Sequence, residues 1–208
     1  MKKKIITQLI KDTDMFVDNF KKGKTWMLAL DSATKNVRGG VGFSEYSSGT
    51  KFFYWVFPDI CFPFIFPYSV QIDVDISEAE RALYLDKSSS SSDQELTNFL
   101  VGKCEMIRDK LRLDYLNIAG LLSADYDRLS SFAKADYLLL KFYIERDFNV
   151  ILEAEPLVQR LNPHNPKTVK FIEFVQFLKS RDELKILEEI ESFRKENEKV
   201  WQSHFENS

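Results

Sequence analysis

The sequence predicts an α+β fold, in which an N-terminal helix and an antiparallel sheet of about four to five strands pack against a mainly helical C-terminal half. Runs rich in aromatic and β-branched residues, which are typical of strands, are concentrated before residue 77. After residue 92, apolar side chains recur mostly at helical spacing. Glycine is scarce, at 7 of 208 residues, which also favours helices.

Composition indicates one α+β domain over residues 1–208, with a division into residues 1–87 and residues 93–208 as the alternative. The apolar content of 44% and the charged content of 29% are close to the averages of globular proteins. The formal net charge of −3 selects no class of partner. Cys61 and Cys104 lie outside any CxxC spacing, so neither a zinc site nor a disulfide framework is indicated.

The chain shows no pattern typical of export or of membrane insertion. Its first apolar run is interrupted at Thr7 and Gln8, before it reaches the length of a signal-peptide core. The aromatic run over residues 51–68 contains three prolines, which exclude a membrane-spanning helix there. We therefore expect a cytoplasmic protein that does not associate with membranes.

The first predicted element is an amphipathic helix over residues 6–20, where apolar side chains recur at helical spacing until Gly23. Three aspartates interrupt its lysine-rich outer face, so nucleic acid is not the expected partner. Strands are predicted next at residues 25–30, 41–46 and 51–57, with a turn at residues 47–50.

The strand patterns at residues 51–57 and 70–76 differ in which faces they expose to solvent. Both faces of residues 51–57 are apolar, which indicates a central strand covered on both sides. Residues 70–76 alternate between apolar and polar side chains, which indicates a strand with one face in solvent. The boundary between these aromatic and acidic faces is the preferred place for a functional site.

Helices are predicted over most of the second half. Two capping boxes, Ser77 with Glu80 and Ser92 with Glu95, predict a short helix ending near Leu85 and a longer helix beyond a serine-rich loop. Asp-Tyr or Asp-Phe pairs recur every eleven residues, at 114–115, 125–126, 136–137 and 147–148. This repeat predicts two or three packed helices ending near Arg146, with the rings in the core and the carboxylates in solvent.

After these helices, residues 148–152 are predicted to return as a strand. Helices follow at residues 156–161 and 166–179, separated by the break NPHNP. A charged helix over residues 182–201 has an apolar face formed by Leu184, Leu187, Ile190, Phe193 and Trp201. We expect this helix either to dock on the core or to form a homodimer through a coiled coil.

The favoured function is a non-enzymatic interaction module, similar in kind to an inhibitor or an immunity protein. Its expected contact residues are Trp55, Phe57, Phe62, Phe64, Phe66, Tyr68, Asp73 and Asp75, which combine aromatic anchors with an acidic rim. Within this set, residues 58–68 are preferred, because their prolines prevent regular strand pairing. Residues 70–95 carry seven acids and two bases, which would suit a basic protein partner.

The alternative function is a Mg²⁺-dependent nuclease or a nucleotidyl- or phosphoryl-transfer enzyme. Asp73 and Asp75 are predicted to share one face of a strand, and Asp31 ends another strand. Carboxylate oxygens suit a hard divalent cation, so these three residues are the candidate catalytic and metal-binding set. No glycine-serine turn precedes the paired acids, and His164 and His204 have no recognisable catalytic partner. No cofactor is therefore expected, and Mg²⁺ is the alternative.

Overall fold

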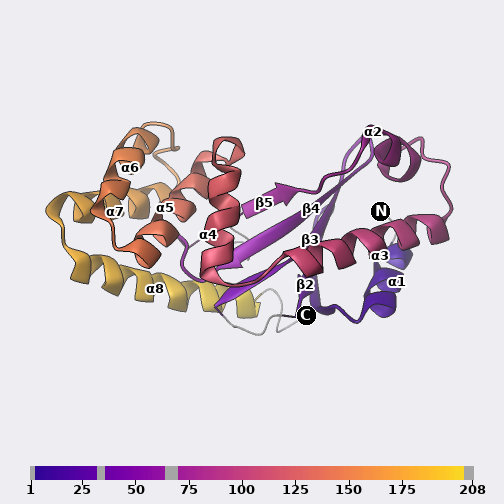
Figure 1. Cartoon of the computed structure of the whole chain (residues 1–208), viewed down its shortest axis with the longest axis horizontal. Coiled ribbons are helices and arrows are strands. Elements are labelled where there is room, and N and C mark those ends of the chain that lie inside the picture. The colour runs from indigo at the N-terminus through magenta and orange to yellow at the C-terminus, as the bar shows by residue number, and fades with distance from the viewer. Residues whose placement is uncertain (1–2, 32–35, 64–69, 204–208) are drawn as a thin grey trace.

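The computed structural model of the chain describes residues 3–31, 36–63 and 70–203. A twisted antiparallel sheet occupies the middle of an elongated molecule (Figure 1). Helices from the second half of the chain gather at one end of the sheet, and the N-terminal helix and one long helix lie together at the other end. The predicted α+β architecture is confirmed.

The sheet is a meander in which each strand pairs with its neighbours in sequence. Its strands are β1 (Phe16–Lys22), β2 (Thr25–Leu30), β3 (Val37–Glu45), β4 (Thr50–Pro58) and β5 (Val70–Asp73), all paired antiparallel. The predicted strands at residues 25–30 and 51–57 are confirmed, and the strand predicted at residues 41–46 is β3, which begins earlier, at Val37. The predicted strand at residues 70–76 ends earlier, at Asp73, because the chain turns away toward Ser77, the N-cap of the next helix.

The predicted first helix is partly wrong. Helix α1 spans Lys3–Thr13 and ends where Asp14 takes a φ of 45°, in the left-handed region that stops a helix. Residues 16–20, which continue the apolar spacing of this helix, lie instead in strand β1. The spacing that suggested one long helix therefore belongs to two elements that pack on the same core.

The second half of the chain is helical. Its elements are α2 (Glu78–Glu80), the π-helical turn η1 (Arg81–Leu85), α3 (Asp93–Lys110), α4 (Tyr115–Ala124), the 3₁₀ turn η2 (Tyr126–Arg128), α5 (Ser131–Glu145), the 3₁₀ turn η3 (Phe148–Val150), α6 (Ile151–Val158), α7 (Pro166–Ser180) and α8 (Glu183–Trp201). Both predicted capping boxes are present. Within the described parts of the chain, no helix is long and apolar enough to cross a membrane.

The predicted strand at residues 148–152 is wrong, because this segment is helical. The side chain of Asp147 accepts a hydrogen bond of 2.9 Å from the backbone N–H of Asn149, which starts the turn η3. Helix α6 follows directly and contains Pro156, where the sequence predicts a helix to begin. The apolar residues of this segment are thus buried by a helix and not by a sheet.

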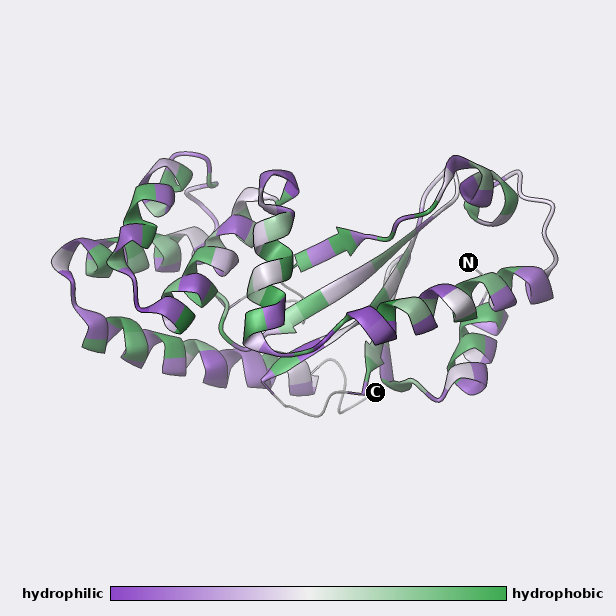
Figure 2. Cartoon of the chain, in the orientation of Figure 1, coloured by the Kyte–Doolittle hydropathy of each residue, from purple (hydrophilic) through white to green (hydrophobic). Residues whose placement is uncertain are grey.

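Three groups of buried side chains form the core. Figure 2 shows hydrophobic and hydrophilic residues interspersed along the helices, as in helices that bury one face. Helices α1 and α3 cover one face of the sheet at one end. The C-terminal helices form the largest group and meet the sheet through β4 and β5. Trp55 and Phe57 of β4 lie in the third group, on the opposite face of the sheet from Phe52. The prediction that β4 is covered on both faces is confirmed.

Helix α8 docks within its own chain. Ile186, Ile190, Phe193 and Trp201 are buried, and Trp201 packs on the rings of Trp55 and Phe57. Arg38 of β3 joins this contact, because its guanidinium lies over the Trp201 ring and binds Glu198 at 2.8 Å. Leu184, which the sequence places on the packing face, is 75% exposed. The apolar face proposed for a homodimer is therefore largely used inside the chain.

Two glycines allow the close approach of neighbouring strands. A Cβ atom on Gly40 of β3 would lie 1.9 Å from the carbonyl oxygen of Leu28, and one on Gly42 would lie 2.3 Å from the Phe53 ring. Backbone atoms of β2 cannot move away as a flexible side chain can. A side chain at position 40 would therefore separate β2 from β3.

We expect Gly40→Ala to lower the free energy of unfolding by about 1–3 kcal/mol or more. Gly102 in α3 is the control, because a Cβ atom there meets nothing within 4 Å. Gly102→Ala should raise the free energy of unfolding by about 0.5–1 kcal/mol, since alanine favours a helix. Urea denaturation measures both changes. Equal effects of the two substitutions would contradict the packing described for Gly40.

Candidate functional site

Six aromatic residues are expected to contact a partner, and the structure describes three of them. Trp55, Phe57 and Phe62 are at most 2% exposed. The ring of Phe62 lies 5.5 Å from the ring of Phe171 and 5.5 Å from that of Phe193, in the middle of the C-terminal helices. A partner protein cannot contact these three rings while the core remains closed. Phe64, Phe66 and Tyr68 lie outside the described residues.

Residues 59–62 form a buried linker between the end of β4 and the C-terminal helices. Regular strand pairing stops there, and side chains from the helices bind several of its backbone groups. The Asn197 side chain donates hydrogen bonds to the carbonyl oxygens of Asp59 at 2.8 Å and Cys61 at 2.9 Å. This segment, preferred for binding on the basis of sequence, therefore ties one half of the fold to the other.

The carboxylate of Asp59 is held by two side chains. It accepts a hydrogen bond of 2.8 Å from Nε of Arg194 and a short one from the hydroxyl of Tyr115. The hydrogen bond to Asp59 raises the pKa of Arg194. Burial raises the pKa of Tyr115, and the hydrogen bond to Asp59 raises it further. Both groups keep their protons at neutral pH, so this cluster serves to join α4 and α8 to the linker.

A second buried cluster centres on Asp136 of α5. Its carboxylate lies 2.5 Å from the ammonium group of Lys167, and it accepts a hydrogen bond of 3.0 Å from the backbone N–H of Phe62. The side chains of Asp136 and Lys167 are 1% and 5% exposed. Burial raises the pKa of Asp136, and the charge of Lys167 opposes that rise. The prediction that the repeat places this carboxylate in solvent is wrong.

The acidic residues of the alternative catalytic set are only partly brought together. Asp73 ends β5 and lies 2.6 Å from the ammonium group of Lys51. Asp75 follows beyond the end of the strand, so the two acids do not share a strand face. Asp31 follows the end of β2, and β3 and β4 lie between that strand and β5. In the part of the chain that the structure describes, no group of three His, Cys, Asp or Glu residues could hold a metal ion.

Two large hollows, of more than 500 Å³ each, adjoin β5, and both include Asp73. The hollow that we call the edge hollow, of about 640 Å³, lies between β5 and the α4–α5 connection. Its lining includes Lys51, Gln71, Asp73, Asp125, Arg128 and Leu129. The front hollow, of about 520 Å³, lies between the end of β5, α3 and α4. Its lining includes Tyr54, Asp73, Asp75, Met106, Lys110, Leu111 and Arg112.

The charges of the two hollows are balanced. Asp73 and Asp75 share the front hollow with Lys110 and Arg112, and Asp73 and Asp125 share the edge hollow with Lys51 and Arg128. Burial, together with the charge of Asp125, raises the pKa of Tyr54 to about 12, so its hydroxyl remains protonated. The hollows therefore offer paired charges and neutral hydrogen-bonding groups, and they do not select a basic partner.

The basic residues of both hollows are absent from the sequence prediction. Lys110, Arg112 and Arg128 come from α3, the α3–α4 connection and the turn η2, which are far along the chain from β5. Only the packing of the helices against the edge of the sheet brings them to Asp73. No local sequence pattern carries that information.

The two edges of the sheet differ in how well they are protected. Strand β1 has a register shift between Phe16 and Asp18 and carries two lysines near its end, which are features that discourage further strand pairing. Strand β5 pairs with β4 in a regular register from Val70 to Asp73 and contains neither lysine nor proline. It is the outer strand at its end of the sheet (Figure 1). Among the residues that the structure describes, no strand pairs with the side of β5 that faces away from β4, and the edge hollow adjoins this strand.

No protein-family model, curated protein or solved structure matches this chain. The outer edge of β5 and the hollows beside it are the features of the described residues that a partner could contact. Every second residue of such an edge points its backbone N–H and C=O groups away from the sheet. These groups are the natural contacts for another extended chain.

Proposed function

We propose that this protein is a non-enzymatic interaction module that binds an extended segment of a partner protein along β5. The observation that carries this proposal is the regular register of β5 at the outer edge of the sheet, beside hollows of about 640 Å³ and 520 Å³, with no further strand on that edge among the described residues. An added strand would continue the meander beyond β5. Its side chains would alternate between the two faces of the sheet.

The hollows supply the specificity that backbone hydrogen bonds lack. One set of alternate side chains of the bound segment would enter the front hollow, where Met106, Leu111 and Leu121 provide apolar contacts. Each backbone hydrogen bond adds only about 0.5–1.5 kcal/mol, so the side chains decide which segment binds. We therefore expect a segment with apolar residues at alternate positions, and not one defined by its net charge.

An inhibitor or an immunity-type protein could act in this way, by occupying a segment that its target needs for another contact. The balanced charges of the hollows remove the reason for expecting a basic target. Both cysteines are free and buried, which suits a protein of the reducing cytoplasm. The enzymatic alternative has less support, because Asp31 follows β2, which β3 and β4 separate from β5, and Asp73 is already paired with Lys51.

The test uses random extended peptides of about ten residues, selected for binding to the purified full chain. In amide NMR spectra, a selected peptide should shift the signals of residues 70–73 and of residues 125–133. Gln71→Trp, which places a large ring in the edge hollow, should weaken the binding of that peptide at least tenfold.

Asn19→Trp is the matched control, because Asn19 is also an exposed amide residue on an edge strand, but on β1. It should change the affinity less than twofold. Signal changes confined to β1 or to the C-terminal helices would contradict the proposal. An unchanged affinity of the folded Gln71→Trp variant would contradict it as well.

A further inference from the structure

A gap interrupts the pairing between β4 and the chain that follows β5. The last pair of the ladder is Phe53 with Asp73. Beyond it the two chains separate, and they meet again at an isolated bridge between Gly49 and Asp86. A hollow of about 300 Å³ lies between these two points, and we call it the ladder gap. Along residues 50–52, the side of β4 that faces the gap has no strand partner among the described residues.

Backbone pairing bounds the ladder gap at both ends, through the Phe53–Asp73 pair and the Gly49–Asp86 bridge. Next to the Gly49–Asp86 bridge, the backbone N–H of Lys87 donates a hydrogen bond of 3.0 Å to the carbonyl oxygen of Ser48. Gly49 permits this contact, because a Cβ atom there would lie 2.3 Å from the carbonyl oxygen of Leu85. The gap is thus a built feature of the fold, bounded by a β-ladder on one side and a tight backbone contact on the other.

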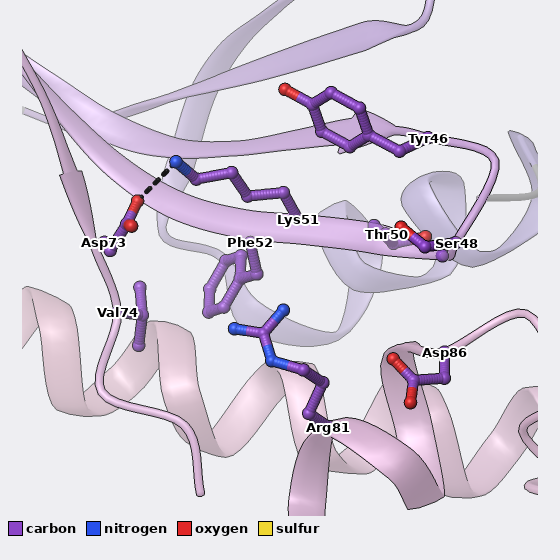
Figure 3. Close-up of a pocket in the computed structure, with 10 residues that line it drawn as sticks. Tyr46, Ser48, Thr50, Lys51, Phe52, Asp73, Val74, Arg81 and Asp86 are labelled. Carbon is purple, nitrogen blue, oxygen red and sulfur yellow. Dashed lines mark ion pairs between the residues drawn. The ribbon is translucent and has the colours of Figure 1, made fainter. Parts of the chain in front are cut away.

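Four charged side chains line the ladder gap, and they differ in their partners. Lys51 and Asp73 bind each other at 2.6 Å (Figure 3). Arg81 and Asp86 form no ion pair or side-chain hydrogen bond with any residue that the structure describes. Figure 3 shows the Arg81 guanidinium pointing into the gap toward Phe52, and the Asp86 carboxylate directed into it from another side. One cation and one anion are therefore available to a ligand.

The position of Arg81 is fixed by an unusual backbone. It is the first residue of η1, and the backbone N–H of Asp86 donates to its carbonyl oxygen at 3.0 Å, which closes the π-helical turn. This turn joins Arg81 and Asp86 and places both on the wall of the gap. Such turns are frequently found at functional sites.

We propose that the ladder gap binds a free α-amino acid, with the ligand carboxylate on Arg81 and the ligand ammonium group on Asp86. A guanidinium group binds a carboxylate through two parallel hydrogen bonds. The four side chains have no net charge, so a ligand with both charges is matched, whereas a phosphate or a diamine would meet unbalanced repulsion from Asp86 or Arg81.

The size and the remaining lining agree with a small polar ligand. A volume of about 300 Å³ is at the lower end of small-molecule sites. The hydroxyl groups of Ser48 and Thr50 supply additional hydrogen bonds, and Phe52 and Val74 supply apolar surface for a short side chain. Lys51 and Asp73 line both this site and the edge hollow, whereas Arg81 and Asp86 line only this site, so an amino acid can bind here without a partner segment on β5.

Isothermal titration of the full chain with each of the common L-amino acids tests this site. We expect at least one to bind and to shift the amide NMR signals of residues 46–52 and 81–86. Its N-acetyl derivative and the amine that lacks its carboxylate should each bind at least tenfold more weakly, because each loses one of the two charged contacts. Inorganic phosphate is the comparison probe, and it should not compete.

Arg81→Gln and Asp86→Asn should each weaken binding at least tenfold, with thermal unfolding showing that both variants remain folded. Arg108→Gln is the control, because Arg108 is an exposed arginine of α3 outside the gap, and it should bind as the parent protein does. Failure of every amino acid to bind would overturn the proposal. Equal binding of the N-acetyl derivative, or competition by phosphate, would overturn it too.

Discussion

Replacement of Asp136 by alanine is expected to lower the free energy of unfolding by about 3–5 kcal/mol. The substitution leaves the ammonium group of Lys167 buried, at 5% exposure, without its counter-charge. It also removes the acceptor for the backbone N–H of Phe62. The cost arises mainly from these unpaired groups and not from the attraction that is lost, because a buried charge without a partner is far less stable than one in water.

Urea denaturation measures this change, and two further variants identify its cause. The double variant Asp136→Leu with Lys167→Met removes both charges, so it should recover a large part of the lost stability. Lys141→Ala breaks the more exposed ion pair with Glu153 and should cost less than about 1 kcal/mol. If Asp136→Ala costs no more than Lys141→Ala, the buried pair does not exist in solution as described.

Phe62→Ala is expected to lower the free energy of unfolding by about 3–5 kcal/mol, the usual cost of emptying a buried phenylalanine site. The Phe62 ring is fully buried and lies 5.5 Å from Phe171, 5.9 Å from Phe174 and 5.5 Å from Phe193. Three segments of the chain, the linker, α7 and α8, thus lose contact at once. Phe62→Leu should cost clearly less, because leucine refills much of the cavity.

Comparison of Phe62→Ala with a variant of an exposed ring distinguishes a core residue from a binding residue. A ring that serves mainly to bind a partner would leave thermal stability almost unchanged when replaced by alanine. Tyr46→Ala provides that reference, because Tyr46 is 59% exposed. An unfolding temperature of Phe62→Ala close to that of Tyr46→Ala would contradict the burial of Phe62.

Much of the fold follows from local patterns. Strand β4 is recognisable because both of its faces are apolar, and α2 and α3 because serine and glutamate stand three residues apart at their starts. Helix α1 illustrates the limit of such patterns. Its apolar spacing continues past Thr13, and only the left-handed backbone at Asp14 separates it from β1.

The roles of the aromatic and acidic residues depend on contacts between distant segments. Residues 58–62 have the composition of an exposed binding loop, but Asp136 and Asn197, from helices that lie much later in the chain, bind backbone groups of residues 59, 61 and 62. Asp136 itself belongs to a repeat whose other acids stand at helix ends, as Asp114 and Asp147 do. Composition cannot show which member of such a repeat faces the core.

The candidate sites also depend on contacts that sequence patterns do not predict. The alternation of apolar and polar side chains along β5 predicts that Asp73 is exposed at a candidate site. The structure places Asp73 in the lining of the edge hollow, the front hollow and the ladder gap. The cations beside it, and the ladder gap itself, depend on where β5 leaves β4 and where the chain returns at Asp86. That return follows from the π-helical turn, which no propensity of its residues specifies.

The contacts of α8 have a consequence for how the protein reaches its native state during synthesis. Asn197 binds the linker carbonyl of Asp59 across 138 residues of chain, and Glu198 binds Arg38 across 160 residues. A ribosome releases the sheet long before it releases α8, so the nascent sheet emerges with Trp55 and Phe57 uncovered. Contacts that span so much of the chain also slow folding. The buried linker is therefore expected to become ordered last, after translation of α8, and the incomplete chain should be the form most in need of chaperones.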